Sequence, residues 1–118
     1  MAPFTIALCP AADIPPGSTA GFASDDPAKP GLLVVHHFRD GFLIYRNACP
    51  HLGVPLDWAP GKFLNADGTR LVCATHGAEF RIADGFCVRG PCRGDRLTSI
   101  PCAVEHGMVV VAPDAWEA

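Results

Sequence analysis

The chain has no run of lysines and arginines, no long apolar stretch and few charged residues. Its 118 residues carry a net charge of −3, with 18% charged and 49% hydrophobic residues. Proteins that bind nucleic acid or an anionic membrane surface concentrate basic residues on one segment or face, and no such cluster is present. No stretch reaches the roughly 18 apolar residues of a membrane span. We therefore expect a compact globular protein with neither nucleic acid nor membrane as a partner.

Signals for export or for several domains are also missing. Segment 1–6 has neither the basic nor the apolar region of an export signal, which predicts a cytoplasmic protein. No repeat or low-complexity segment divides the chain, and its length suits one domain spanning residues 1–118. In a reducing compartment, the six cysteines are better explained as metal ligands or buried thiols than as a disulfide framework.

Little of the sequence has the pattern of a helix. Five of the 12 prolines fall in segment 10–31, which excludes long regular elements there. Further on, short apolar segments flank glycine-containing turns. The expected hairpins pair 32–37 with 42–45, 63–64 with 71–72, 79–82 with 86–88, and 103–104 with 108–111. Many short strands joined in this way predict an all-β fold, a sandwich or a small barrel.

Two short motifs carry the chemistry. Cys49-Pro50-His51 and Cys73-Ala74-Thr75-His76 each present one thiolate and one imidazole from a loop at the end of a hairpin. Four such ligands suit either a tetrahedral zinc ion or a [2Fe–2S] cluster whose two irons have different ligands. The C-x-H spacing argues against zinc, because zinc motifs favour paired cysteines with longer histidine arms.

The remaining cysteines and histidines lack ligand spacing. We expect Cys9, Cys87, Cys92 and Cys102 to be small buried thiols. A Cys87–Cys92 disulfide is the alternative, because Gly90 and Pro91 between them predict a turn. His36, His37 and His106 are expected to be structural or surface residues.

The motifs and their surroundings resemble the cluster-binding boxes of Rieske [2Fe–2S] proteins. C-P-H-L-G-V at 49–54 and C-A-T-H-G-A at 73–78 match the boxes. Arg89-Gly90-Pro91 resembles the Pro-containing loop that covers the cluster, and the whole resemblance extends over 45–111. It implies an all-β, Rieske-type fold of small antiparallel sheets, which form a base and a cluster-binding hairpin subdomain.

The resemblance also implies a ligand set. Cys49 and Cys73 would bind one iron through sulfur, and His51 and His76 would bind the other through Nδ1. Four thiolates leave an oxidised cluster with a net charge of about −2, whereas two thiolates and two neutral imidazoles leave it neutral. A neutral cluster accepts an electron more easily, so its potential is higher than that of an all-cysteine cluster.

Four positions depart from the high-potential members of that family. Those proteins have a disulfide where this chain has Val54 and Thr75, and hydroxyl donors to sulfur where it has Ala78 and Phe80. Fewer donors stabilise the added electron less, so we expect a potential near the low end of the Rieske range, about −150 mV. The spacer between the boxes is also longer than usual in segment 58–69. We expect a surface hairpin there; the alternative is a partner-recognition loop with Trp58 or Phe63 exposed.

The implied function is that of a soluble one-electron carrier, not an enzyme itself. It would take electrons from a flavin-dependent reductase and pass them to a terminal oxygenase, through a small docking surface that includes Leu52 and Pro91. The alternatives are a small Rieske-like subunit of a nitrite reductase, a redox or nitric-oxide sensor with the same cluster, and a structural zinc-binding module.

Overall fold

The computed structural model describes residues 3–50, 53–75 and 77–117. The strands are β1 (Ile6–Pro10), β2 (Thr19–Phe22), β3 (Leu32–His37), β4 (Gly41–Arg46), β5 (Arg70–Val72), β6 (Glu79–Arg81), β7 (Cys87–Arg89), β8 (Ser99–Ile100), β9 (Cys102–Glu105) and β10 (Met108–Val111). Two short 3₁₀ helices, η1 (Ala11–Asp13) and η2 (Ala115–Glu117), complete the described elements. Among these residues, no helix is both long and apolar enough to cross a membrane.

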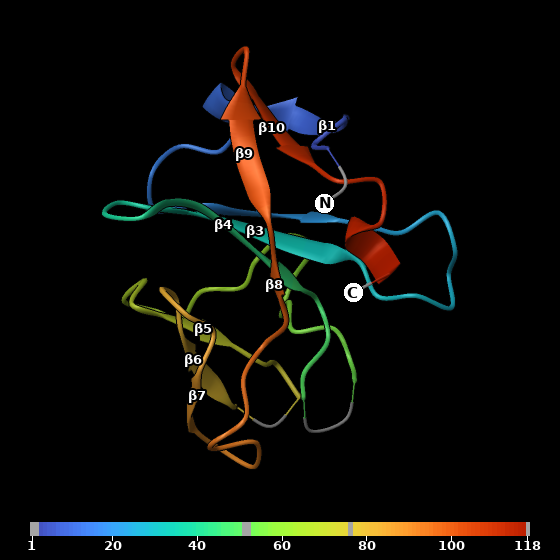
Figure 1. The fold of residues 1–118 in the computed structure, drawn as a ribbon. Helices are drawn as coiled ribbons and strands as arrows, with labels where there is room; N and C mark the ends of the chain where they lie inside the picture. Colours follow the sequence, from blue (N-terminus) through green and yellow to red (C-terminus); the bar gives the residue numbers. More distant parts are fainter. Residues whose placement is uncertain (1–2, 51–52, 76, 118) are drawn as a thin grey trace.

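The strands form three antiparallel sheets, with the orders β1-β10-β9, β2-β3-β4-β8 and β5-β6-β7. The sheet that contains β3 and β4 lies in the middle, with β1, β9 and β10 on one side and β5, β6 and β7 on the other (Figure 1). The first two sheets are the base, and the third belongs to a separate hairpin subdomain. The predicted all-β fold is confirmed, with the strands divided among three small sheets.

Strand β3 has an unbroken apolar sequence because both of its faces are buried. Leu32 and Val34 pack in the core of the base with Val109. Leu33 and Val35 pack in a second core, which the hairpin subdomain shares. Neighbouring side chains of a strand point to opposite faces, so one strand contributes to both cores.

Three of the four predicted hairpins are confirmed: β3 pairs with β4, β6 with β7, and β9 with β10. The hairpin expected between 63–64 and 71–72 is reduced to one bridge, with Leu64 opposite Leu71. Phe63 turns its side chain into the core near Gly21 of β2. Its backbone stays beside β5, since Val72 N–H donates to Phe63 O at 2.8 Å and Asn65 N–H donates to Arg70 O at 2.9 Å.

The chain leaves the base after β4 and returns to it just before β8. At this crossing, Arg46 N–H donates to Thr98 O at 2.9 Å. The buried hydroxyl of Tyr45 donates to Ile82 O at 2.7 Å, which ties β4 to the turn between β6 and β7. Burial, with a smaller contribution from the Asp84 carboxylate, raises the pKa of Tyr45 to about 12, so this donor stays protonated. The subdomain is therefore anchored to the base at its entry.

Segment 58–69 is anchored as well, which corrects one expectation. Phe63, considered as an exposed recognition residue, is fully buried, whereas Trp58 is 57% exposed. Thr19 Oγ1 donates to Gly61 O at 2.7 Å, and Trp58 Nε1 donates to Leu64 O at 3.0 Å. The longer spacer is a surface hairpin, and its Gly61 and Phe63 contact β2.

Candidate metal centre

The two motif loops are closed by the same pair of backbone hydrogen bonds. In each loop the cysteine N–H donates to the carbonyl five residues further on, and the N–H of the glycine four residues on donates back to the cysteine carbonyl. These bonds measure 2.8 and 2.6 Å around Cys49, and 2.8 and 2.9 Å around Cys73. Gly53 and Gly77 have φ angles of 73° and 69°, a conformation that residues with a Cβ disfavour. The shared Cys-x₃-Gly spacing therefore reflects one loop geometry used twice.

Both cysteines are buried in the core of the subdomain. Cys49 is 3% exposed and Cys73 is 1% exposed, and they belong to one cluster of buried side chains that includes Phe80 and Leu97. No disulfide links any of the six cysteines, all of which the structure describes. Two buried thiols at matched positions of two loops have the chemistry of sulfur ligands for a metal centre held from two sides.

A backbone hydrogen bond joins the second motif to the segment just after the first, close to positions 54 and 75, where high-potential Rieske proteins have a disulfide. Ala74 N–H donates to Leu56 O at 3.0 Å, and Leu56 N–H donates to Asn47 Oδ1 at 2.8 Å. The Asn47 amide also donates to Asp57 Oδ1 at 3.2 Å. Sequence reasoning missed this link. An asparagine two residues before the first motif is the one signal for it, since that side chain commonly bonds to nearby backbone.

The Pro-containing loop packs directly against the second motif. Gly90 has a φ of 98°, and a Cβ built on it would lie 2.7 Å from the Cα of Ala78. Cys92, directly after this loop, is 2% exposed. Burial first, and then the neighbouring Cys87 and Cys49, raise the pKa of the Cys92 thiol. Three loops thus converge, and Cys92 lies beside the first motif.

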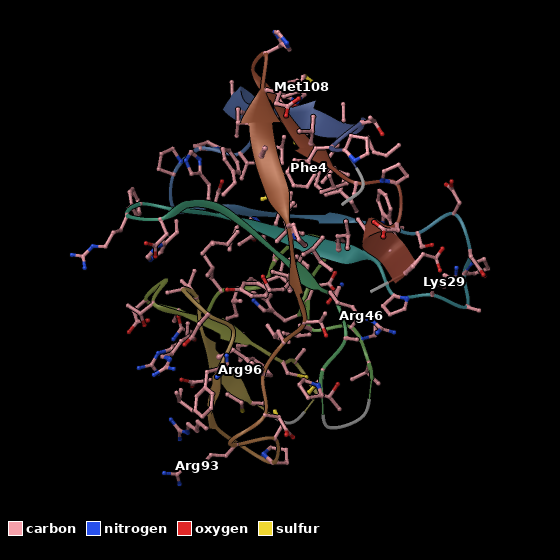
Figure 2. The ribbon with its side chains drawn as sticks, viewed as in Figure 1. Phe4, Lys29, Arg46, Arg93, Arg96 and Met108 are labelled. Atoms are coloured by element: carbon pink, nitrogen blue, oxygen red, sulfur yellow. The ribbon has the colours of Figure 1, made fainter. Side chains whose placement is uncertain are left out.

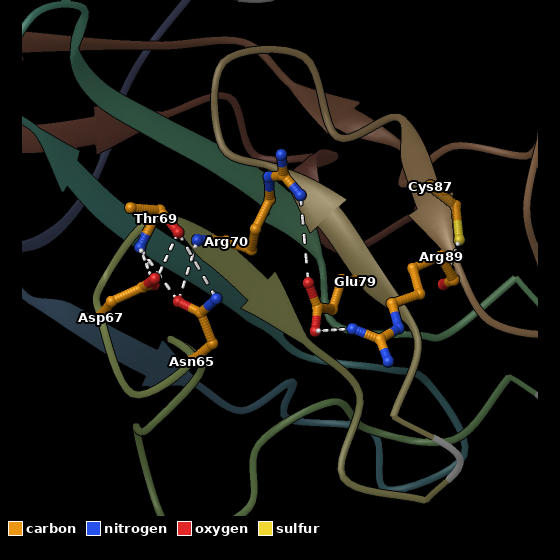
Figure 3. Close-up of polar contacts among 7 residues, drawn as sticks. All are labelled: Asn65, Asp67, Thr69, Arg70, Glu79, Cys87 and Arg89. Carbon is orange, nitrogen blue, oxygen red and sulfur yellow. Dashed lines mark hydrogen bonds and ion pairs between the residues drawn. The ribbon is translucent and has the colours of Figure 1, made fainter.

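Two ion pairs connect the three strands of the small sheet on its surface. Glu79 on β6 lies between Arg70 on β5 and Arg89 on β7, with N–O distances of 3.9 and 3.8 Å (Figure 3). The Arg89 side chain is 76% exposed, so these pairs are screened and contribute little to stability.

The remaining predicted site residues are accounted for as follows. His51, Leu52 and His76 lie outside the described residues. His36 Nδ1 lies 2.6 Å from Ile14 O, and its ring stacks on Phe42, as expected of a structural residue. His37 contacts Asp40, and His106 is exposed in the turn before β10.

The family model of the Rieske [2Fe-2S] domain matches residues 4–104. The chain therefore belongs to the Rieske [2Fe-2S] domain family, and its cofactor is a [2Fe–2S] cluster. The two buried cysteines in matched loops fit this cofactor, because each would supply one sulfur ligand from its own loop. The ligand types allowed either a zinc ion or a [2Fe–2S] cluster, and family membership excludes zinc.

Solved structures with the same fold include three ferredoxins or ferredoxin complexes. The complex of reduced oxygenase and oxidized ferredoxin in carbazole 1,9a-dioxygenase contains a chain that is 25% identical, with 91% of each chain covered and a TM-score of 0.69. The ferredoxin of carbazole 1,9a-dioxygenase from Nocardioides aromaticivorans IC177 is 21% identical, with 94% of this chain and 99% of that one covered and a TM-score of 0.71.

The Sphingomonas yanoikuyae B1 ferredoxin is 26% identical to this chain. The match covers 91% of this chain and 96% of the ferredoxin, with a TM-score of 0.66. No curated protein sequence matches the chain. These likenesses agree with the base and hairpin subdomain that the sequence predicts.

Proposed function

We propose that this protein is a one-electron carrier of the cytoplasm, reduced by a flavin-dependent reductase and oxidised by a terminal oxygenase. The ligands of the cluster in this proposal are Cys49 and Cys73 for one iron and His51 and His76 for the other. The cluster supplies a site that takes up and releases one electron. The protein itself performs no chemistry on a substrate.

The observation that carries the proposal is the likeness to the chain in the oxygenase–ferredoxin complex. It covers 91% of both chains, so the shared part is nearly the whole of that partner protein and not one domain of it.

The described surface around the motifs suits brief contact with a partner. Its exposed residues are small and uncharged: Pro50, Gly53, Ala74, Thr75, Gly77, Gly90 and Pro91. A partner can approach such a surface closely without displacing long side chains, and weak redox complexes have small interfaces of this kind. The exposed side chains of Arg89 and Arg93 border it, and Figure 2 shows Arg93 at the end of the molecule opposite Met108. The surface therefore offers positive charge to an acidic partner face.

Anaerobic electron transfer tests the proposal. The purified protein is reduced with NADH and a catalytic amount of a flavin-dependent ferredoxin reductase, and bleaching of its visible absorbance is followed. It is then mixed rapidly with an oxidised ring-hydroxylating oxygenase, and we expect the colour to return at a rate proportional to the oxygenase concentration. A cluster that dithionite reduces but neither protein reduces or oxidises would contradict the proposal. Transfer to a nitrite reductase instead of an oxygenase would favour the alternative function.

Ala78→Ser is expected to raise the midpoint potential by roughly 40 mV. Ala78 is fully buried behind the second motif and lies at a position where high-potential members carry a hydroxyl donor to sulfur. A hydroxyl there stabilises the extra negative charge of the reduced state by about 1 kcal/mol more than that of the oxidised state. Potentiometric titration followed by EPR measures the change. Ala74→Ser, on the exposed side of the same loop, is the matched control, and an unchanged or lower potential for Ala78→Ser would rule out this account.

A further inference from the structure

Cys87 and Cys92 bring two sulfur atoms into contact beneath the Pro-containing loop. Their Sγ atoms lie 3.1 Å apart, and the residues are 0% and 2% exposed. Cys87 Sγ also lies 3.2 Å from Arg89 O, a contact drawn in Figure 3. The Cys87 S–H thus donates to this carbonyl, whereas Cys92 Sγ contacts both Cys87 and Cys49.

The backbone around the pair holds both cysteines on one closed loop. Cys87 N–H donates to Asp95 O at 2.8 Å, and Gly94 N–H donates to Cys87 O at 3.1 Å. Asp95 N–H donates to Cys92 O at 2.9 Å. A disulfide bond is about 2.05 Å long, so the sulfurs need to approach by about 1 Å, a movement within reach of side-chain rotation.

We propose that Cys87 and Cys92 are a disulfide-forming pair that locks the Pro-containing loop over the cluster. In the reaction two S–H bonds break and one S–S bond forms. The two electrons and two protons pass to a two-electron oxidant such as hydrogen peroxide, which leaves as two water molecules. A dithiol reductant reverses the step by thiol–disulfide exchange. This bond closes the third loop on itself, unlike a bridge between positions 54 and 75 of the two motif loops.

The position of the pair connects its redox state to the cluster. Gly90, between the two cysteines, rests against Ala78 of the second motif, and Cys92 lies beside Cys49 of the first. A covalent tie across this loop therefore limits movement next to both motifs. A surface hollow of about 520 Å³ is lined in part by Cys87 and Arg93, and it is the side from which a small oxidant would reach the buried pair when the loop opens.

Peptide mapping tests bond formation directly. The cluster-loaded protein is treated with diamide, which takes up the two thiol hydrogens as a hydrazine, and is then denatured, alkylated and digested with trypsin. Cleavage after Arg81, Arg89 and Arg93 places the two cysteines on separate peptides, 82–89 and 90–93. We expect these peptides joined by a disulfide in the treated sample and singly alkylated in a sample reduced with dithiothreitol. Absence of the joined species, or a link from Cys92 to the peptide of Cys49, would overturn the proposal.

Three variants sharpen the result. Cys92→Ser and Cys87→Ser should each abolish the joined peptides, whereas Cys102→Ser should retain them, because Cys102 lies in the base with its Sγ 3.6 Å from Phe42 O. Loss of the joined peptides in Cys102→Ser would show that the bond depends on a thiol outside this loop, which would overturn direct pairing of Cys87 and Cys92.

The rate of iron loss tests whether the disulfide restrains the loop. Transfer of iron to a chelator should be several-fold slower for the diamide-treated wild type than for the reduced form. The same treatment should leave the rate of Cys92→Ser unchanged. Equal rates for both wild-type forms would overturn the lock. The assay involves no reductase or oxygenase, so its outcome is independent of the proposed electron acceptor.

Discussion

Cys73→Ser is expected to yield a colourless protein with almost no iron. The wild type binds about two irons per chain as a [2Fe–2S] cluster, and its serine variant has lost one of the two sulfur ligands that the proposal assigns. Cys73 is buried at the base of a closed loop, so serine there would offer a hydroxyl in place of the thiolate that iron binds strongly. Iron analysis and the visible spectrum after identical purification measure the effect.

Cys102→Ser is the control for this experiment, because it removes a half-buried thiol from the base and leaves both motifs intact. We expect full colour and iron content for it. EPR of the dithionite-reduced control then tests the other half of the ligand set, since an average g value below that of all-cysteine clusters indicates histidine ligands. A Cys73→Ser protein with wild-type iron content would refute the assigned ligands.

Gly90→Ala is expected to destabilise the protein by about 2–5 kcal/mol, the largest effect on stability that we predict. The φ of 98° costs an alanine about 1–2 kcal/mol, and the added methyl meets the Cα of Ala78 at 2.7 Å. Both atoms at that contact belong to loops next to the cluster. Relief of the overlap therefore moves the Pro-containing loop away from the second motif, which lowers cluster retention.

Gly94→Ala separates the two causes. Gly94 has a φ of 95°, nearly that of Gly90, but a Cβ built there meets no atom within 4 Å. Its variant should lose about 1–2 kcal/mol, the cost of backbone conformation without overlap. Thermal unfolding of both variants measures the difference, at roughly 4 °C for each kcal/mol. Equal losses for the two variants would show that the contact with Ala78 has no cost.

What the sequence predicts well depends on local pattern. The run from Leu32 to Val35 and the glycine turns identify the main hairpins, and the two motifs identify the metal chemistry. The burial of Phe63 could not be predicted from local pattern, because it depends on Gly21 of a strand inside the Pro-rich segment. From sequence alone, an apolar residue in a loop can be predicted as exposed or as buried with equal justification. The position of the neighbouring strand decides between the two.

The contacts between loops were also beyond sequence reasoning. The hydrogen bond from Ala74 to Leu56 and the sulfur contact between Cys87 and Cys92 join groups whose backbones are placed by different turns. Sequence spacing showed that a Cys87–Cys92 bridge was conceivable. The contact distance and the burial of both sulfurs make it a specific proposal.

The crossing between base and subdomain has a consequence for engineering. The chain departs after Arg46 and re-enters at Thr98, and a hydrogen bond of 2.9 Å holds these points together. The base therefore keeps the two ends of the intervening segment adjacent, so lengthening that segment adds only a slowly growing cost of loop closure. A graft between related scaffolds must bring matching partners for Tyr45 and Thr19, which are two of the side chains that bond across the joint.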